Sequence, residues 1–211
     1  MRRGIIFDMD GTLWDASEEV ANSWKEAIKA SAITDKVLTK EDFMRVMGKP
    51  MDELIDALFP ELSKSEQTKL LEDCCEVENA CLREHGAKLY PGVEQMFAEL
   101  KKEYFIAIVS NCQCGYIEAF LEYYGFGQYI DDIQCFGMNE VSKGENIRLV
   151  AERNHLKDAV YVGDIQGDYD ASKTAGVQFI HAAYGFGEIA EDVTQIESPS
   201  ELKEILKQIW K

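Results

Sequence analysis

Four aspartates stand directly after two short apolar runs of the chain. Asp8 and Asp10 follow the first run, and Asp164 and Asp168 follow another much later in the sequence. Runs of this kind are typical of strands buried in a parallel sheet, and the carboxyl ends of such strands meet at one edge. Four carboxylates gathered there cannot all stay ionised unaided, so a divalent cation is expected. Oxygen ligands without a nearby histidine or cysteine favour Mg²⁺.

Three further polar residues are expected at the same edge. Ser110 and Asn111 directly follow the apolar run 104–109. Lys143 lies at the start of a helical pattern that comes after the run 132–136. A metal ion held by carboxylates, an ammonium group and a hydroxyl donor together would form a site for a phosphoryl group. Asn111 is open to two interpretations, since it could orient a loop or touch the substrate. Taken singly, each of these residues would be an ordinary turn, cap or surface residue, so the prediction depends on their convergence.

Short strand-like runs alternate with amphipathic helical patterns along most of the chain. The runs are rich in Val, Ile and aromatic residues and lack polar alternation, as expected for strands covered on both faces. This order predicts an α/β fold, with a Rossmann-like parallel sheet core and helices on both faces. The predicted strands are 4–7, 104–109, 132–136, 159–162 and 177–181.

Residues 16–86 interrupt the alternation, because only helical patterns occur there. So much helix is too much for one crossover and predicts an inserted all-helical cap domain. The predicted division is a catalytic core, 1–15 and 87–211, and a cap, 16–86; the alternative is that these helices belong to the main layers. Within the cap, the turn at Lys49 could reach the site, where its ammonium group would bind a carboxylate or second phosphate of the substrate. A surface turn is the alternative.

The composition limits the partners and the compartment. The formal net charge is −17, from 22 basic and 39 acidic residues, which argues against nucleic acid and anionic membranes as partners. No run of the sequence has the length needed to cross a bilayer, and no signal peptide is expected. The six cysteines form no CxxC pair and are interpreted as reduced thiols of a cytoplasmic protein. The sequence does not indicate an oligomeric state.

The residues singled out above also resemble the motifs of a known family, the haloacid dehalogenase-like (HAD) superfamily of phosphohydrolases. Its DxDGT motif stands at residues 8–12, its Ser or Thr after a strand is Ser110, its Lys is Lys143, and its GDxxxD motif spans 163–168. The four motifs occur in order, with an insertion between the first two where the family carries a helical cap. Residues 90–93, Tyr-Pro-Gly-Val, resemble phosphoglycolate-phosphatase-like members.

The resemblance implies two-step phosphoryl transfer. Asp8 would be the nucleophile and form an aspartyl phosphate. Asp10 would protonate the leaving alcohol and then deprotonate the attacking water. Asp10 also separates phosphate-ester chemistry from dehalogenation, because the dehalogenases of the family lack an Asp at this position.

The resemblance also implies how the metal and phosphate are held. Mg²⁺ would bind the Asp8 carboxylate, the Asp10 backbone carbonyl and Asp164, with Asp168 as direct or water-mediated support. Ser110, Lys143 and loop amides, with Asn111 as a further candidate, would hold the phosphoryl oxygens. The predicted roles are therefore catalysis by Asp8 and Asp10; phosphate binding by Ser110, Asn111 and Lys143; metal binding by Asp8, Asp10, Asp164 and Asp168; and substrate specificity through Lys49.

The expected function is therefore a Mg²⁺-dependent phosphatase of small phosphorylated metabolites, most like phosphoglycolate phosphatase. Two alternatives remain open. A sugar-phosphate mutase of this fold would also carry Asp10, and a catalytically silent binding or regulatory module would be expected to lose Asp8 or Asp10. The sequence does not identify the substrate.

Overall fold

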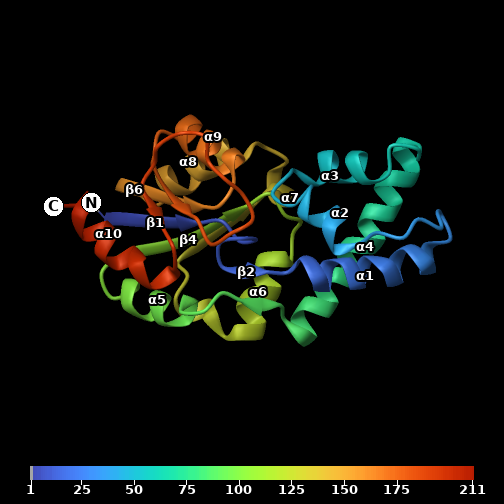
Figure 1. Ribbon diagram of the computed structural model, residues 1–211, viewed down its shortest axis with the longest axis horizontal. Helices are drawn as coiled ribbons and strands as arrows, with labels where there is room; N and C mark the ends of the chain where they lie inside the picture. The colour runs from blue at the N-terminus through green and yellow to red at the C-terminus, as the bar shows by residue number, and fades with distance from the viewer. Residues whose placement is uncertain (1) are drawn as a thin grey trace.

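A computed structural model describes residues 2–211, in which a six-stranded parallel sheet forms the centre of the larger part (Figure 1). The strand order is β5-β4-β1-β6-β7-β8, and every neighbouring pair is parallel. The strands are β1 (Arg2–Phe7), β4 (Phe105–Ser110), β5 (Asp132–Cys135), β6 (Leu156–Gly163), β7 (Gln178–Ala182) and β8 (Gln195–Ile196). All five strands predicted from the sequence are confirmed, and the short β8 at the sheet edge is additional.

Helices cover both faces of the sheet, which confirms the predicted fold class. In Figure 1, α8 (Lys143–Arg153) and α9 (Gln166–Ala175) lie above it, and α5 (Val93–Leu100), α6 (Tyr116–Tyr124) and α10 (Leu202–Ile209) lie below. The short helices α7 (Phe136–Asn139), η1 (Phe126–Gln128) and η2 (Pro199–Glu201) join these elements.

The side chains of β1 show why the sheet needs two helical layers. Phe7 packs edge-on against Phe97 of α5, with ring centroids 5.5 Å apart. Ile6 points to the opposite face, into the cluster that contains Ile147 and Val150 of α8. Because successive residues of a strand face opposite sides, an uninterrupted apolar run is stable only when both sides are covered.

The stretch from residue 16 to residue 86, all within the described part of the chain, contains four α-helices and no strand. They are α1 (Ser17–Ser31), α2 (Lys40–Met44), α3 (Met51–Leu58) and α4 (Lys64–His85). Figure 1 shows them together beyond the carboxyl ends of β1 and β4. The domain bounds, 1–15 and 87–211 against 16–86, remain a prediction.

The chain enters and leaves this helical segment at adjacent points. The two-residue strands β2 (Trp14–Asp15) and β3 (Lys88–Leu89) pair antiparallel, with Trp14 opposite Leu89. The two connections are therefore fixed to one another beside the sheet edge. Among residues 2–211, no helix combines the length and apolar character that a membrane span requires.

Candidate active site

Three of the four predicted aspartates lie together at the carboxyl edge of the sheet. Asp8 follows β1 and Asp164 follows the neighbouring strand β6, so the parallel pairing alone brings them side by side. Carboxylate oxygens of Asp8, Asp164 and Asp168 all lie within 4.8 Å of one another, and all three residues are buried. The predicted convergence of distant acids at one sheet edge is present.

Lys143 supplies the cation of this cluster. Its Nζ lies 2.9 Å from Asp8 Oδ1 and 2.7 Å from Asp168 Oδ1. Lys143 is the first residue of α8, whose N-cap Ser142 accepts a hydrogen bond from the Glu145 amide. Burial alone would lower the pKa of Lys143, but the carboxylates of Asp168 and Asp8 outweigh burial and hold it above its usual range. The ammonium form of Lys143 is therefore favoured by its neighbours.

Burial disfavours the charged form of two of these carboxylates, Asp8 and Asp164. Burial and the nearby Asp168 carboxylate raise the pKa of Asp8 to about 6 and that of Asp164 to about 8. With all three carboxylates ionised, the one ammonium group leaves two formal negative charges, which a bound divalent cation would balance. The donor set, made of carboxylate oxygens, suits a hard cation such as Mg²⁺.

Asp168 uses both carboxylate oxygens in contacts with the protein. Oδ1 accepts from Lys143, and Oδ2 accepts from the backbone amides of Asp164 at 3.0 Å and Ile165 at 3.2 Å. Asp168 thus fixes both the lysine and the loop that carries Asp164. These contacts agree with a supporting position rather than with an exposed ligand.

A glycine-bearing loop, residues 185–187, packs against Asp164. The Phe186 amide donates to Asp164 Oδ2 at 2.8 Å. A Cβ at Gly185 would lie 2.3 Å from Asp164 Cβ, and one at Gly11 would lie 1.9 Å from Asp164 Oδ2. Gly11 also has a φ of +82°, which favours glycine. Both positions therefore need glycine for the backbone to approach the carboxylate.

Asp10 lies outside the three-carboxylate cluster and has its own partner. Its Oδ1 accepts a 2.7 Å hydrogen bond from the hydroxyl of Tyr116, the first residue of α6. Burial raises the pKa of Asp10 to about 8, although the Tyr116 hydrogen bond opposes this. A group of this kind can hold a proton near neutral pH and release it, as a general acid and base must.

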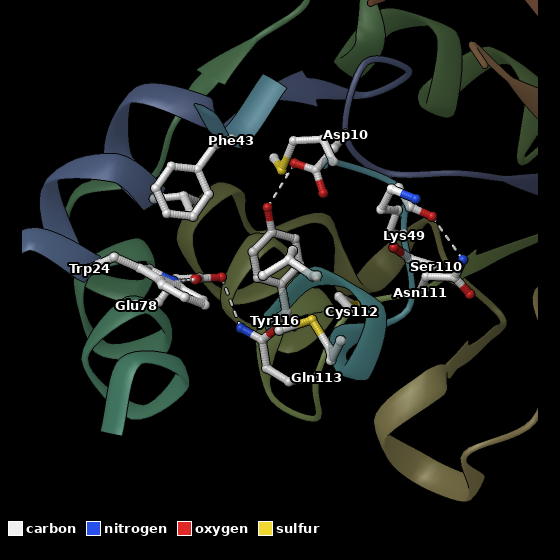
Figure 2. Close-up of a pocket in the computed structure, with 15 residues that line it drawn as sticks. Asp10, Trp24, Phe43, Lys49, Glu78, Ser110, Asn111, Cys112, Gln113 and Tyr116 are labelled. Carbon is white, nitrogen blue, oxygen red and sulfur yellow. Dashed lines mark hydrogen bonds between the residues drawn. The ribbon is translucent and has the colours of Figure 1, made fainter. Parts of the chain in front are cut away.

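The remaining predicted residues line a pocket next to Asp10 (Figure 2). Ser110 ends β4 and is buried. The Asn111 side-chain amide donates to the Gly48 carbonyl at 2.8 Å. This contact corresponds to the loop-orienting role, one of the two roles considered for Asn111 from the sequence. Lys49 also lines the pocket, but its Nζ lies 3.7 Å from Glu53 Oε2 and the side chain is 45% exposed.

Three polar residues of the pocket that make hydrogen bonds there were not predicted from the sequence: Tyr116, Glu78 and Gln113. A local signal exists for Glu78, because Leu70, Cys74, Glu78 and Leu82 recur every fourth residue along α4 and all are buried. An acid in an apolar stripe is a buried polar group that must find partners. Tyr116 and Gln113 follow no comparable pattern, since an aromatic or amide near a helix start is commonplace.

Comparisons with known proteins agree with this geometry. The profile of the haloacid dehalogenase-like hydrolase family matches residues 5–182. The phosphoglycolate phosphatases of Escherichia coli O157:H7 and Salmonella typhi are each 26% identical to this chain over 218 residues, covering 87% of it and 82% of their own length.

Solved structures show the same fold. One is a predicted phosphoglycolate phosphatase from Haemophilus somnus 129PT, and another is CbbY from Rhodobacter sphaeroides in complex with xylulose-(1,5)-bisphosphate. Each has a TM-score of 0.81 and 20% identity and covers 96% of both chains. The predicted enzyme class, a phosphoric monoester hydrolase, is confirmed by the family and these relatives. On the match over residues 5–182, the chain belongs to the haloacid dehalogenase-like hydrolase family.

Proposed function

We propose that this chain is a Mg²⁺-dependent phosphatase that hydrolyses small phosphorylated metabolites through an aspartyl phosphate on Asp8. The observation that carries the proposal is the buried Lys143 ammonium group, which bridges Asp8 and Asp168 beside Asp164. This arrangement orients the Asp8 carboxylate and places positive charge where phosphoryl oxygens would gather.

The reaction would proceed by two successive displacements at phosphorus. An oxygen of Asp8 attacks phosphorus, the bond from phosphorus to the leaving alcohol oxygen breaks, and Asp10 gives its proton to that oxygen. A water molecule then loses a proton to Asp10 and attacks the same phosphorus, which releases Asp8 and inorganic phosphate. Ser110 and Lys143 hold the phosphoryl oxygens, and Tyr116 keeps the Asp10 carboxylate in place.

Asp8, Asp164 and the Asp10 backbone carbonyl would hold the metal, with Asp168 supporting them. When bound, Mg²⁺ would neutralise charge on the phosphoryl oxygens as they approach the carboxylates. The fit rests on the buried carboxylate oxygens, which carry two formal charges more than Lys143 balances.

Residues 16–86 would act as a cap domain over this site and would set the choice of substrate, Lys49 included. Support comes from the pocket, which is lined jointly by residues of this segment and of the sheet edge. The free state of all six cysteines agrees with a reducing compartment and hence with the cytoplasm. Phosphoglycolate is the first substrate that the relatives suggest.

Hydrolysis of p-nitrophenyl phosphate, with Mg²⁺ and with EDTA, tests the proposal. We expect metal-dependent release of phosphate by the wild type, and a loss of roughly a thousandfold or more in Asp8→Asn, which removes the nucleophile. Circular dichroism establishes that the variant is folded. Absence of metal-dependent hydrolysis would instead favour a silent binding module, and phosphate migration on a sugar without net release would identify a mutase.

A further inference from the structure

The pocket beside Asp10 is where the leaving group of a substrate would lie, because Asp10 is the proposed proton donor. Figure 2 shows it between helices of residues 16–86 and the loop after β4. The space inside is about 40 Å³, enough for a few water molecules or a very small organic group. Its walls on the helical side are mostly apolar: Val20, Trp24, Phe43, Met51 and Leu54.

Glu78 is a buried carboxylate in this apolar wall. It is 3% exposed, and its two oxygens accept hydrogen bonds from the Trp24 indole and, at 2.8 Å, from the Gln113 amide. Both donors are neutral, and no cation of residues 2–211 is among the groups that act on Glu78. A buried carboxylate without a cation is costly, and each oxygen retains the capacity to accept another hydrogen bond.

A second buried acceptor of the pocket belongs to Asn111. The Asn111 amide is oriented by its donation to the Gly48 carbonyl. That orientation leaves Asn111 Oδ1 buried, and within the described chain it has no hydrogen-bond partner. The cation of the lining, Lys49, lies close to Glu53 and is about half exposed to solvent, so it does not neutralise Glu78.

We propose that Glu78 determines substrate specificity, by accepting a hydrogen bond from a hydroxyl or ammonium group of the leaving alcohol and by excluding leaving groups that carry a carboxylate. The inference rests on the proposed function and narrows it. A carboxylate on the leaving group would lie beside the Glu78 carboxylate in this small cavity and, with Glu78 ionised, would meet a like charge at low dielectric. The described residues that line the pocket include no buried cation to offset that repulsion. A donor group on the leaving alcohol would instead give the Glu78 carboxylate a further hydrogen bond.

Phosphoglycolate is therefore a poor fit to this pocket, although the named relatives are phosphoglycolate phosphatases. Its leaving group, glycolate, ends in a carboxylate. Ethanolamine and ethylene glycol have the same two-carbon size but end in an ammonium and a hydroxyl group. These three leaving groups form a matched series that differs in the one feature Glu78 would read.

The test compares kcat/KM for 2-phosphoglycolate, phosphoethanolamine and 2-hydroxyethyl phosphate. For the wild type we expect the two donor-bearing esters to exceed 2-phosphoglycolate by roughly tenfold or more. In Glu78→Gln we expect this ratio to fall by about tenfold, because the repelling charge is removed. The matched control is Glu76→Gln, which removes a charge from an exposed position of the same helix and should leave the ratio unchanged.

The outcomes separate this inference from the proposed function. Hydrolysis of p-nitrophenyl phosphate without the expected ranking, or with 2-phosphoglycolate preferred, would overturn the role of Glu78 and leave the phosphatase standing. An unchanged ratio in a folded Glu78→Gln would do the same. If no ester is hydrolysed with Mg²⁺, the phosphatase itself is wrong. The wild-type ranking decides the matter even if Glu78→Gln fails to fold.

Discussion

The Lys143 ammonium nitrogen lies 2.9 Å from Asp8 Oδ1, although the two residues are 135 positions apart in the chain. Their side chains are 5% and 3% exposed. Such a contact requires α8 to pack on the sheet beside the end of β1, so the site and the fold depend on one another. Removing one partner of a buried ion pair leaves the other charge without compensation.

Lys143→Ala should therefore lose both stability and activity. Asp8 and Asp168 would face each other without a cation, and we expect the free energy of unfolding in EDTA to fall by about 3 kcal/mol. Activity toward p-nitrophenyl phosphate should fall roughly a hundredfold or more. Urea unfolding and steady-state rates measure the two effects. Lys157→Ala, at an exposed position, is the control, and equal behaviour of the two variants would contradict the role of Lys143.

Mg²⁺ should stabilise the folded protein through Asp164. A ligand that binds only the native state at about a hundred times its Kd adds about 2.7 kcal/mol, which raises Tm by roughly 5 °C or more in a chain of this size. Asp164→Asn should require roughly tenfold more Mg²⁺ for the same shift in a thermal melt. Asp170→Asn changes an exposed residue of the helix that carries Asp168 and should melt like the wild type. If Mg²⁺ does not change the Tm of the wild type, the proposed metal site is refuted.

The meeting of the acids at one edge of the sheet could be predicted from the sequence because the acidic residues directly follow the strands that position them. Asp8 and Asp164 each follow an apolar run directly, and a parallel sheet has only one carboxyl edge. The same reasoning placed Lys143, which opens a helix after a strand. These residues are local in sequence to the element that positions them, so a short pattern suffices.

The residues beyond the sheet edge could not be placed in this way. Tyr116 reaches Asp10 across 106 positions, and Gln113 reaches Glu78 on a different segment. The first contact depends on how α6 packs beside the end of β1, and the second on how α4 packs against the loop after β4. Both follow from side-chain shape rather than from a periodic pattern. The contact of the Phe186 loop was not predicted for the same reason. The Phe186 amide donates to Asp164 Oδ2 only because the tertiary fold brings this loop back beside Asp164.

Tyr116→Phe should lower kcat more than it changes KM. The hydroxyl touches Asp10 and is buried, so its loss frees the carboxylate to rotate away from the leaving group. We expect kcat to fall about tenfold with little change in KM, because an interaction needed in the transition state is removed. Tyr123→Phe removes a hydroxyl from a 44% exposed position of the same helix and serves as the control. A change in KM alone would assign Tyr116 to substrate binding instead.

The charge on Glu78 should make the protein less stable as the pH rises. Burial raises the pKa of Glu78 from 4.5 to about 7, and hydrogen bonds from Gln113 and Trp24 only partly oppose it. Between these values the folded state keeps a proton that the unfolded state has released. Raising the pH through this window therefore removes stability, and the full effect is present above about pH 7. Its size is on the order of 3 kcal/mol, from about 1.4 kcal/mol for each pH unit.

Glu78→Gln cannot ionise, so it should escape this loss. In urea unfolding with EDTA present, the free energy of unfolding of Glu78→Gln minus that of the wild type should increase by on the order of 3 kcal/mol between about pH 4.5 and pH 8. The variant thus gains stability relative to the wild type as the pH rises. Taking the difference between the two proteins cancels the titration of carboxylates that both contain. Glu76→Gln, changed at an exposed position of the same helix, controls for removal of a glutamate. Parallel pH profiles for wild type and Glu78→Gln would mean that the Glu78 carboxylate titrates alike in the folded and unfolded chains.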